Sequence, residues 1–296
     1  MNGSATEAKP PGLRIRKLTQ LDLAFAESVR AAAGWNQTPG DWERFLETEP
    51  DGCFLAEWEG RPAGTVTTTS YGPDLAWIGM VLVDPAHRRR GIGRALLEYA
   101  IGHLRGRGVR CIKLDATPAG KLIYDELGFK NEWTLRRWSG VSDGAGSFIL
   151  TKDSIREWGP NGHLQVEGPD IGAFGCSRKR LLAALAKQSH PALVTRSSSG
   201  GITGFGFSRP GSLARYLGPV VADCSEGGLG LVETILGAYP GQNFFWDIPD
   251  PNEPAWRWAE QHGFSIQRPL TRMYLGDNLI PGDPRRQFAL AGPEVG

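Results

Sequence analysis

A strand that leads through a short basic loop into a helix is the feature that most constrains the fold of this chain. Residues 80–83 (Met-Val-Leu-Val) predict a buried strand, which ends at Asp84-Pro85 because proline has no amide hydrogen for strand pairing. The loop Arg88-Arg89-Arg90-Gly91-Ile92-Gly93 follows, and helical apolar spacing begins at Arg94. The first backbone N–H groups of a helix have no partner within it, so together with the arginines they can bind an anion. The sequence therefore predicts a phosphate-binding loop.

The pattern of this loop narrows the kind of phosphate ligand. It lacks the Gly-Lys-Ser/Thr of ATP- and GTP-binding loops and the third glycine of the dinucleotide-binding pattern. Arg88, Gly91 and Gly93 fill the pattern Arg/Gln-x-x-Gly-x-Gly/Ala, which resembles the pyrophosphate loop of the GNAT superfamily of N-acetyltransferases. Taken alone, the segment could also be a solvated basic turn before a surface helix.

A second motif strengthens the resemblance. A predicted strand over residues 111–116 is followed by a predicted helix over residues 118–127, which stops at Gly128-Phe129. In the family a late helix carries a tyrosine and ends four residues on in Gly-Phe, and Tyr124 holds that tyrosine position. The two motifs lie in the family's order, about one helix and one strand apart, so the resemblance is specific.

The composition indicates a soluble globular protein with two domains of ordinary size. The chain has 296 residues, of which 40% are hydrophobic and 22% charged. A formal net charge of +1 argues against a general nucleic-acid or membrane-surface binder, and we find neither a membrane-spanning apolar run nor a signal-peptide core. We therefore expect a cytoplasmic protein, a monomer or a homodimer, that has no nucleic-acid or membrane partners. We also expect residues 1–12 to be disordered.

The cysteines argue against disulfides and against a structural metal. Cys53, Cys111, Cys176 and Cys224 are widely scattered, with no Cys-x-x-Cys pair and no histidine at metal-binding spacing. We expect free thiols, as is usual in the cytoplasm, and no metal site.

The same order of helices and strands occurs twice. In the first half we predict helices over residues 19–33, 39–48, 92–105 and 118–127, and strands over 53–58, 63–70, 75–83, 111–116 and 129–138. In the second half we predict helices over 177–188, 226–238 and 253–262, and strands over 192–196, 202–208, 214–221, 244–248 and 264–275. Alternation over residues 65–70 predicts a half-exposed strand.

The repeat resembles that of tandem GNAT proteins, because Gly263-Phe264 repeats the helix stop at Gly128-Phe129. The implied fold class is α/β (α+β), with two tandem GNAT-like domains, each a mixed, mostly antiparallel twisted sheet flanked by helices. We expect an acetyl-CoA-binding catalytic domain over residues 13–140, a linker over 141–165 and a degenerate GNAT-like domain over 166–296.

The two copies differ in charge at the loop. Where the first has consecutive arginines, the second reads Ala222-Asp223-Cys224-Ser225-Glu226-Gly227-Gly228, with two acids that repel phosphate. Ala259 stands where the first copy has Tyr124. We therefore expect the second copy to help shape the substrate pocket rather than to bind the cofactor.

The resemblance implies which residues bind acetyl-CoA. Backbone groups of Val81, Leu82 and Val83 would bind the pantetheine arm while their side chains pack in the core. The loop would hold the pyrophosphate through Arg88, Arg89, Arg90, Gly91, Ile92, Gly93 and Arg94. Tyr124 would protonate the leaving sulfur, since a phenol with a pKa near ~10 matches a thiolate of similar basicity. The alternative for Tyr124 is a buried aromatic with a satisfied hydroxyl.

The residues that would bind the acceptor amine or act as the base are predicted less specifically. Asp115, at a strand end beside the cleft, would serve as a base directly or through water, or would cap the helix that starts near residue 118. Trp35 and Asn36, an exposed pair that interrupts the helical pattern, and Tyr71 at another strand end would line the pocket. For Trp35 the alternative is packing at the edge of the core.

The function expected from this resemblance is direct transfer of an acetyl group from acetyl-CoA to a primary amine of a small molecule, without a metal. Two alternatives stay open. One is acetylation of a protein lysine or N-terminus, and the other is a non-catalytic sensor that binds acyl-CoA.

Overall fold

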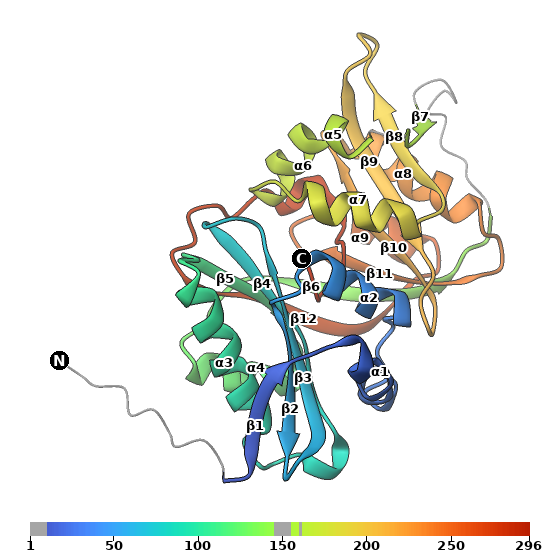
Figure 1. Ribbon diagram of the computed structural model, residues 1–296. Coiled ribbons are helices and arrows are strands. Elements are labelled where there is room, and N and C mark those ends of the chain that lie inside the picture. The colour runs from blue at the N-terminus through green and yellow to red at the C-terminus, as the bar shows by residue number, and fades with distance from the viewer. Residues whose placement is uncertain (1–10, 145–154, 160–161) are drawn as a thin grey trace.

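The computed structural model describes residues 11–144, 155–159 and 162–296, which form two halves side by side (Figure 1). The first half contains β1 (Leu13–Lys17), α1 (Leu23–Ala32), α2 (Pro39–Thr48), β2 (Cys53–Trp58), β3 (Arg61–Ser70), β4 (Leu75–Val83), α3 (Ile92–Gly106), β5 (Cys111–Ala116), α4 (Pro118–Glu126) and β6 (Lys130–Val141). The second contains β7 (Ile155–Glu157), α5 (Gly162–Gln165), α6 (Glu167–Phe174), α7 (Lys179–Gln188), β8 (Ala192–Arg196), β9 (Ile202–Arg209), β10 (Arg215–Ala222), α8 (Ser225–Gly237), β11 (Asn243–Pro249), α9 (Glu253–Gln261), β12 (Ser265–Gly276) and β13 (Gln287–Ala289).

Every helix and strand predicted from the sequence is present, and several further elements are not among the predictions. These are β1, β7, α5, α6 and β13. Of them, β7 and α5 lie within the segment predicted as a linker, and residues 145–154 and 160–161 of that linker lie outside the described residues. So do residues 1–10 of the segment predicted to be disordered.

One mixed sheet runs through both halves, which confirms the predicted α/β class. Its strand order is β1-β2-β3-β4-β5-β12-β6-β11-β10-β9-β8-β7, and β13 pairs with β10 off this path. The halves exchange strands at the centre, because β12 of the second half lies between β5 and β6 of the first, and β6 in turn lies beside β11. At the middle of this exchange Leu135 of β6 lies opposite Leu270 of β12. The two halves are therefore built around an approximate two-fold axis at this leucine pair.

Two buried ion pairs flank the central leucine pair. Arg272 of β12 donates two hydrogen bonds of 2.9 Å to Asp115 of β5. Arg137 of β6 donates two of 2.7 and 2.6 Å to Asp247 of β11. Each arginine lies two residues after its central leucine, so the pairs are related by the approximate two-fold axis. A buried carboxylate needs a paired cation, and here each half supplies the arginine for a carboxylate that is buried in the other half.

The half-exposed strand predicted over residues 65–70 is wrong, because β3 is covered on both faces. Thr65, Thr67 and Thr68 are each 0% exposed. Helix α3 packs on one face of β3, and α1 and α2 pack on the other (Figure 1). Alternating threonines can fill a covered face as well as an open one, so their pattern does not distinguish the two cases.

The substitution Arg137→Met should lower the free energy of unfolding by about 3–5 kcal/mol, since it leaves the Asp247 carboxylate buried without its cation. Both halves should unfold in a single transition, because each contains a strand that pairs with the other. Urea denaturation followed by tryptophan fluorescence and by circular dichroism measures both quantities.

A matched control for this prediction is Arg136→Met on the same strand. Arg136 is 31% exposed and pairs with Asp250, so its loss should cost no more than about 1 kcal/mol. Equal losses for the two variants, or two separate transitions, would contradict the role assigned to the exchanged strands.

Candidate functional site

Strands β4 and β5 separate part-way along their length and leave a gap in the sheet. Their parallel pairing covers only residues 75–77 of β4 and 111–113 of β5. Beyond it β4 stays paired with β3 on its other side, so one edge of β4 has no strand partner among the described residues. This edge contains Val81, Leu82 and Val83, the residues predicted to contact the pantetheine arm. An extended ligand can add to such an edge as a further strand.

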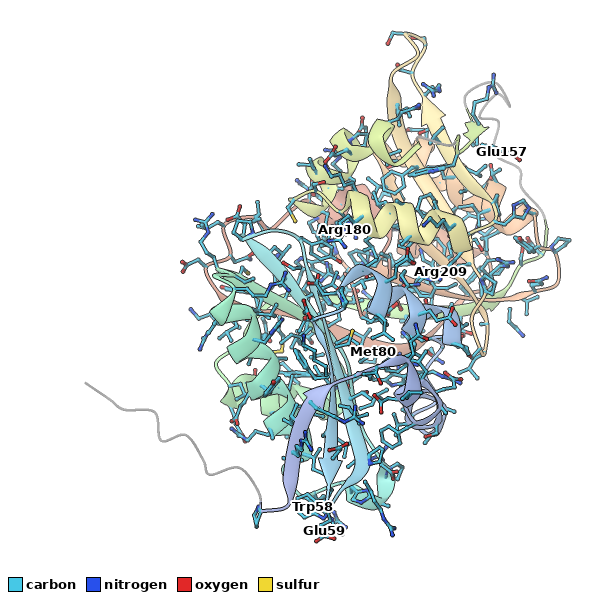
Figure 2. The ribbon with its side chains drawn as sticks, in the orientation of Figure 1. Trp58, Glu59, Met80, Glu157, Arg180 and Arg209 are labelled. Atoms are coloured by element: carbon cyan, nitrogen blue, oxygen red, sulfur yellow. The ribbon has the colours of Figure 1, made fainter. Side chains whose placement is uncertain are left out.

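A bulge at Met80 lies where the two strands separate, in the interior of the molecule (Figure 2). Met80 has a φ of +49°, and Thr65 donates its hydroxyl to the Met80 carbonyl oxygen at 2.9 Å. Before the bulge Ile78 packs in the core on the α3 side, whereas after it Val81 and Val83 do. One inserted residue explains this change of face.

The basic loop forms a left-handed turn at the start of α3. Arg89 and Gly91 have φ values of +61° and +76°, a left-handed geometry that brings successive N–H groups together. No side chain caps the helix at Gly91, which leaves the first-turn N–H groups for a ligand. Ile92 is 1% exposed and holds the turn in the core. A Cβ added to Gly93 would make an ordinary contact, 3.6 Å from Val83.

Positive charge surrounds this turn. Residues 88–90 are exposed arginines, and none of them has an ion-pair partner among the described residues. The guanidinium of Arg90 lies over the ring of Trp58, 5.3 Å from its centroid, at the end of the first half far from the second (Figure 2). Arg94 differs, because it is paired with Glu126. The three loop arginines are therefore the ones available to a phosphate.

A cavity lies where the gap in the sheet meets the second half. It holds about 460 Å³ of empty space, part of it open to solvent. The first half contributes Met80, Val81 and Tyr124 to its wall, and the second contributes Arg268 of β12 and Glu294 of the C-terminal segment. Both halves therefore build one cavity next to the free edge of β4.

Tyr124 is half-buried in this cavity, and its hydroxyl has no hydrogen-bond partner among the described residues. Burial raises the pKa of Tyr124 to about 12, so the phenol keeps its proton at neutral pH. Its ring packs edge-on against Phe129, with 5.9 Å between centroids. One turn earlier Gly120 leaves room for the ring, since an added Cβ would lie 3.0 Å from it. A held phenol with an unused proton suits a general acid.

Asp115 and Trp35 also line the cavity. Asp115 is buried with both oxygens bound by Arg272, and this burial raises the pKa of the carboxyl group although the arginine opposes the shift. The predicted alternative, that Asp115 caps the next helix, is wrong because Thr117 does so by accepting from the Gly120 N–H. The role of Asp115 as a base stays a prediction.

Asn36 and Tyr71 lie outside the cavity and connect the halves instead. Asn36 is 5% exposed, so the exposure predicted for it is wrong. Its side chain donates to the Ala214 carbonyl and accepts from the N–H groups of Leu213 and Ala214. Tyr71 donates its hydroxyl to the Val295 carbonyl at 2.6 Å. These hydrogen bonds hold both side chains between the two halves, so neither side chain reaches the cavity.

Comparisons with known proteins identify the family that shares this geometry. The profile described as Acetyltransferase (GNAT) family matches residues 19–129, and the one described as Acetyltransferase (GNAT) domain matches residues 168–289. The ribosomal protein bS18-alanine N-acetyltransferase of Escherichia coli is 43% identical over 140 residues, which cover 45% of this chain and 89% of that protein. This chain belongs to the GNAT acetyltransferase family.

Other relatives support the tandem arrangement. A solved Pyrococcus horikoshii protein, named there only as a candidate acetyltransferase, has a TM-score of 0.83 at 25% identity over 100% of both chains. A tandem GNAT protein of clavulanic acid biosynthesis has a TM-score of 0.64 at 14% identity, over 89% of this chain and 98% of its own, and shows the shared fold. YitH of Bacillus subtilis, an uncharacterised N-acetyltransferase, is 29% identical over 51% of this chain, and the match covers only 53% of YitH.

In the second GNAT unit the chain itself fills the corresponding gap. β10 and β11 are paired over residues 215–217 and 244–246 and then separate, as β4 and β5 do. β13 lies in this gap antiparallel to β10, with Ala289 opposite Val220. The indole N–H of Trp246 on β11 donates to the Phe288 carbonyl at 2.7 Å. A strand therefore occupies the place that stays open between β4 and β5.

Phe288 also covers the helix start that corresponds to the phosphate loop. Its ring lies on Gly228 in the first turn of α8, where an added Cβ would be 2.4 Å from the ring. Asp223 in the preceding loop pairs with Arg286. The prediction that this unit binds no pyrophosphate rests on its acidic loop, and the filled gap adds a second physical reason.

The C-terminal segment then continues into the first cavity. Glu294 passes so close to β4 that a Cβ on Gly79 would lie 2.5 Å from its carbonyl oxygen. Its buried carboxylate accepts from Gln37 at 2.8 Å and from Arg209 at 3.4 Å. Burial raises the pKa of Glu294, and the neighbouring arginines oppose that shift. Sequence analysis missed Gln37, Arg268 and Glu294, because they meet only through the exchanged strand and the C-terminal segment.

No helix among the described residues is both long and apolar enough to cross a bilayer. Within the same residues, no group of three or more histidine, cysteine, aspartate or glutamate side chains could hold a metal ion.

The substitution Gly228→Ala should destabilise the protein, because the new methyl group would meet the Phe288 ring. The neighbouring Gly227→Ala should be neutral or stabilise by up to about 1 kcal/mol, since its nearest atom is 3.5 Å away and alanine favours a helix. Thermal unfolding of both variants provides the measurement. If the two shift Tm alike, Phe288 is not seated on α8.

Proposed function

We propose that this chain is an N-acetyltransferase that transfers the acetyl group of acetyl-CoA directly to a primary amine of a small molecule, using the first GNAT unit alone. GNAT proteins take acetyl-CoA as co-substrate. The observation that carries the proposal is the contrast between two related gaps. One is open and contains a tyrosine hydroxyl that has no partner in the described part of the chain, and the other is filled by β13.

The residues of the first unit fit the parts of acetyl-CoA. The left-handed turn at Arg89 and Gly91 and the loop arginines would hold the pyrophosphate, and the free edge of β4 would hold the pantetheine arm. Acetyl-CoA supplies the activated acetyl group. Tyr124 would then move the proton on its phenolic oxygen to the departing sulfur, and the proton that the attacking amine loses would restore the phenol. Its raised pKa keeps this proton on the phenol at every pH near neutrality, although transfer to sulfur is then less favourable than from a phenol with a pKa near ~10.

The make-up of the cavity wall supports a small acceptor. Tyr124 of the first unit and Arg268 and Glu294 of the second line the same cavity, so the acceptor would bind between the two halves. Acetylation of a protein N-terminus is the second candidate, favoured by the 43% identity to an enzyme named for a ribosomal alanine. That match covers only 45% of this chain, so it says little about a wall built by both units. Four free cysteines support a cytoplasmic location.

The substitution Gly93→Asp should weaken acetyl-CoA binding at least about tenfold more than Gly93→Asn, because only aspartate adds negative charge beside the pyrophosphate. Both side chains fit, since the nearest atom to a new Cβ is 3.6 Å away. An acid in the first turn stabilises the helix itself, so unfolding would not explain the loss. Calorimetry should show one site per chain in the unaltered protein. Equal affinities, or two sites, would contradict the proposal.

The substitution Tyr124→Phe should lower turnover about 10²-fold or more while the Kd for acetyl-CoA changes little, because only the proton donor is lost. Release of the coenzyme A thiol, measured with any amine that the protein acetylates, reports turnover. Tyr99→Phe is the control, as Tyr99 is 41% exposed on α3 outside the cavity. Unchanged turnover in Tyr124→Phe would remove this residue from the mechanism.

A further inference from the structure

Two polar side chains in the wall of the cavity have unused hydrogen-bonding atoms. The Oε1 of Gln37 and the Nε of Arg268 are both buried without a hydrogen-bond partner among the described residues. Both side chains line the cavity that also contains Tyr124. Leaving a buried polar atom unpaired destabilises a protein, so such atoms in a cavity indicate groups held ready for a ligand.

Glu294 fixes which atom Gln37 presents. The Nε2 of Gln37 donates to Glu294 at 2.8 Å, and Gln37 itself is 8% exposed. Arg209 and Arg44 lie 3.4 and 3.9 Å from the other oxygen of Glu294 and favour its ionised form, which only accepts hydrogen bonds. Toward an ionised Glu294 the amide keeps its nitrogen, and its oxygen then remains as an acceptor for a ligand.

Arg268 presents a cation without a counter-ion. It follows a bulge in β12 and forms no ion pair with a described residue. Burial lowers the pKa of Arg268 to about 10, so the guanidinium is still charged at neutral pH. Arg268 lies two residues before Leu270, and Trp133 lies two residues before Leu135. The approximate two-fold axis therefore relates Arg268 to Trp133 of the filled unit. The unpaired cation is thus found on the side where the gap is open.

We propose that the acceptor is an amine that also carries a carboxylate, with the amine donating to Gln37 Oε1 and the carboxylate paired with Arg268. This inference rests on the proposed function and narrows its substrate class to amino acids and related amines. Arginine binds a carboxylate through two parallel hydrogen bonds. An amide oxygen orients an amine without the full negative charge that would keep it protonated, so the nitrogen stays nucleophilic.

The test compares carboxylates with their amides as acceptors for the full-length protein. The pairs are alanine and alaninamide, β-alanine and β-alaninamide, and γ-aminobutyrate and its amide, each assayed by release of the coenzyme A thiol. In at least one pair the carboxylate should have a kcat/KM about 10²-fold or more above that of the amide, because the amide leaves Arg268 unpaired. The inference is overturned if the carboxylate is preferred in none of the pairs. Preference for the amides would indicate a peptide N-terminus as the acceptor instead.

Arg268→Gln should abolish this preference by raising KM for the carboxylate, with the Kd for acetyl-CoA unchanged. It should also leave Tm unchanged or higher, since it removes a half-buried charge that has no ion-pair partner among the described residues. Arg136→Gln on the adjacent strand is the control and should keep the preference, because Arg136 pairs with Asp250 outside the cavity. A preference that survives Arg268→Gln would overturn the inference. Failure of the unaltered protein to bind acetyl-CoA would instead contradict the proposed function.

Discussion

The exchange of β6 and β12 is the constraint on which the rest of the structure depends. It places Arg137 and Arg272 against carboxylates of the opposite unit, and neither carboxylate has another cation so close among the residues that the structure describes. Breaking such a buried pair from one side destabilises a protein strongly, so the two units are not independent modules. The same strand that carries Arg272 also carries Arg268, four residues earlier. The cavity wall is therefore fixed by a strand at the centre of the sheet, which positions a side chain more accurately than a loop does.

The two units show how one fold can leave the gap between two strands open or fill it. Both have a parallel strand pair that separates, and both have a helix that begins beside the gap. In the first unit the gap is open and the helix start is surrounded by arginines. In the second, β13 supplies the strand partner and Phe288 covers the helix start. The chain thus satisfies with its own backbone the groups that a bound ligand would satisfy.

The sequence alone predicted the parts of this structure that depend on short-range pattern. The bounds of β4 and the start of α3 could be predicted, as could the helix with Tyr124, because apolar period, proline and glycine determine them locally. The strand exchange could not, since the pairing of Leu135 with Leu270 depends on contacts between distant segments. The three-residue strand β13 has no periodicity to detect. For that reason Glu294 and Arg268 escaped prediction, as did Gln37 beside Glu294, whereas Tyr124 and Asp115 of the same cavity were predicted.

The C-terminal segment has a consequence for how the two gaps are linked. A strand tethered to its own binding site acts at an effective concentration in the millimolar range or above, so a free ligand competes with it poorly. Restoring arginines to the loop at residues 222–228 would therefore not create a second site while β13 stays in place. Withdrawing β13 would in turn draw Glu294, five residues beyond it, away from Gln37. The second gap can open only if the first loses part of its wall, so the C-terminal segment prevents both gaps from being open and complete at the same time.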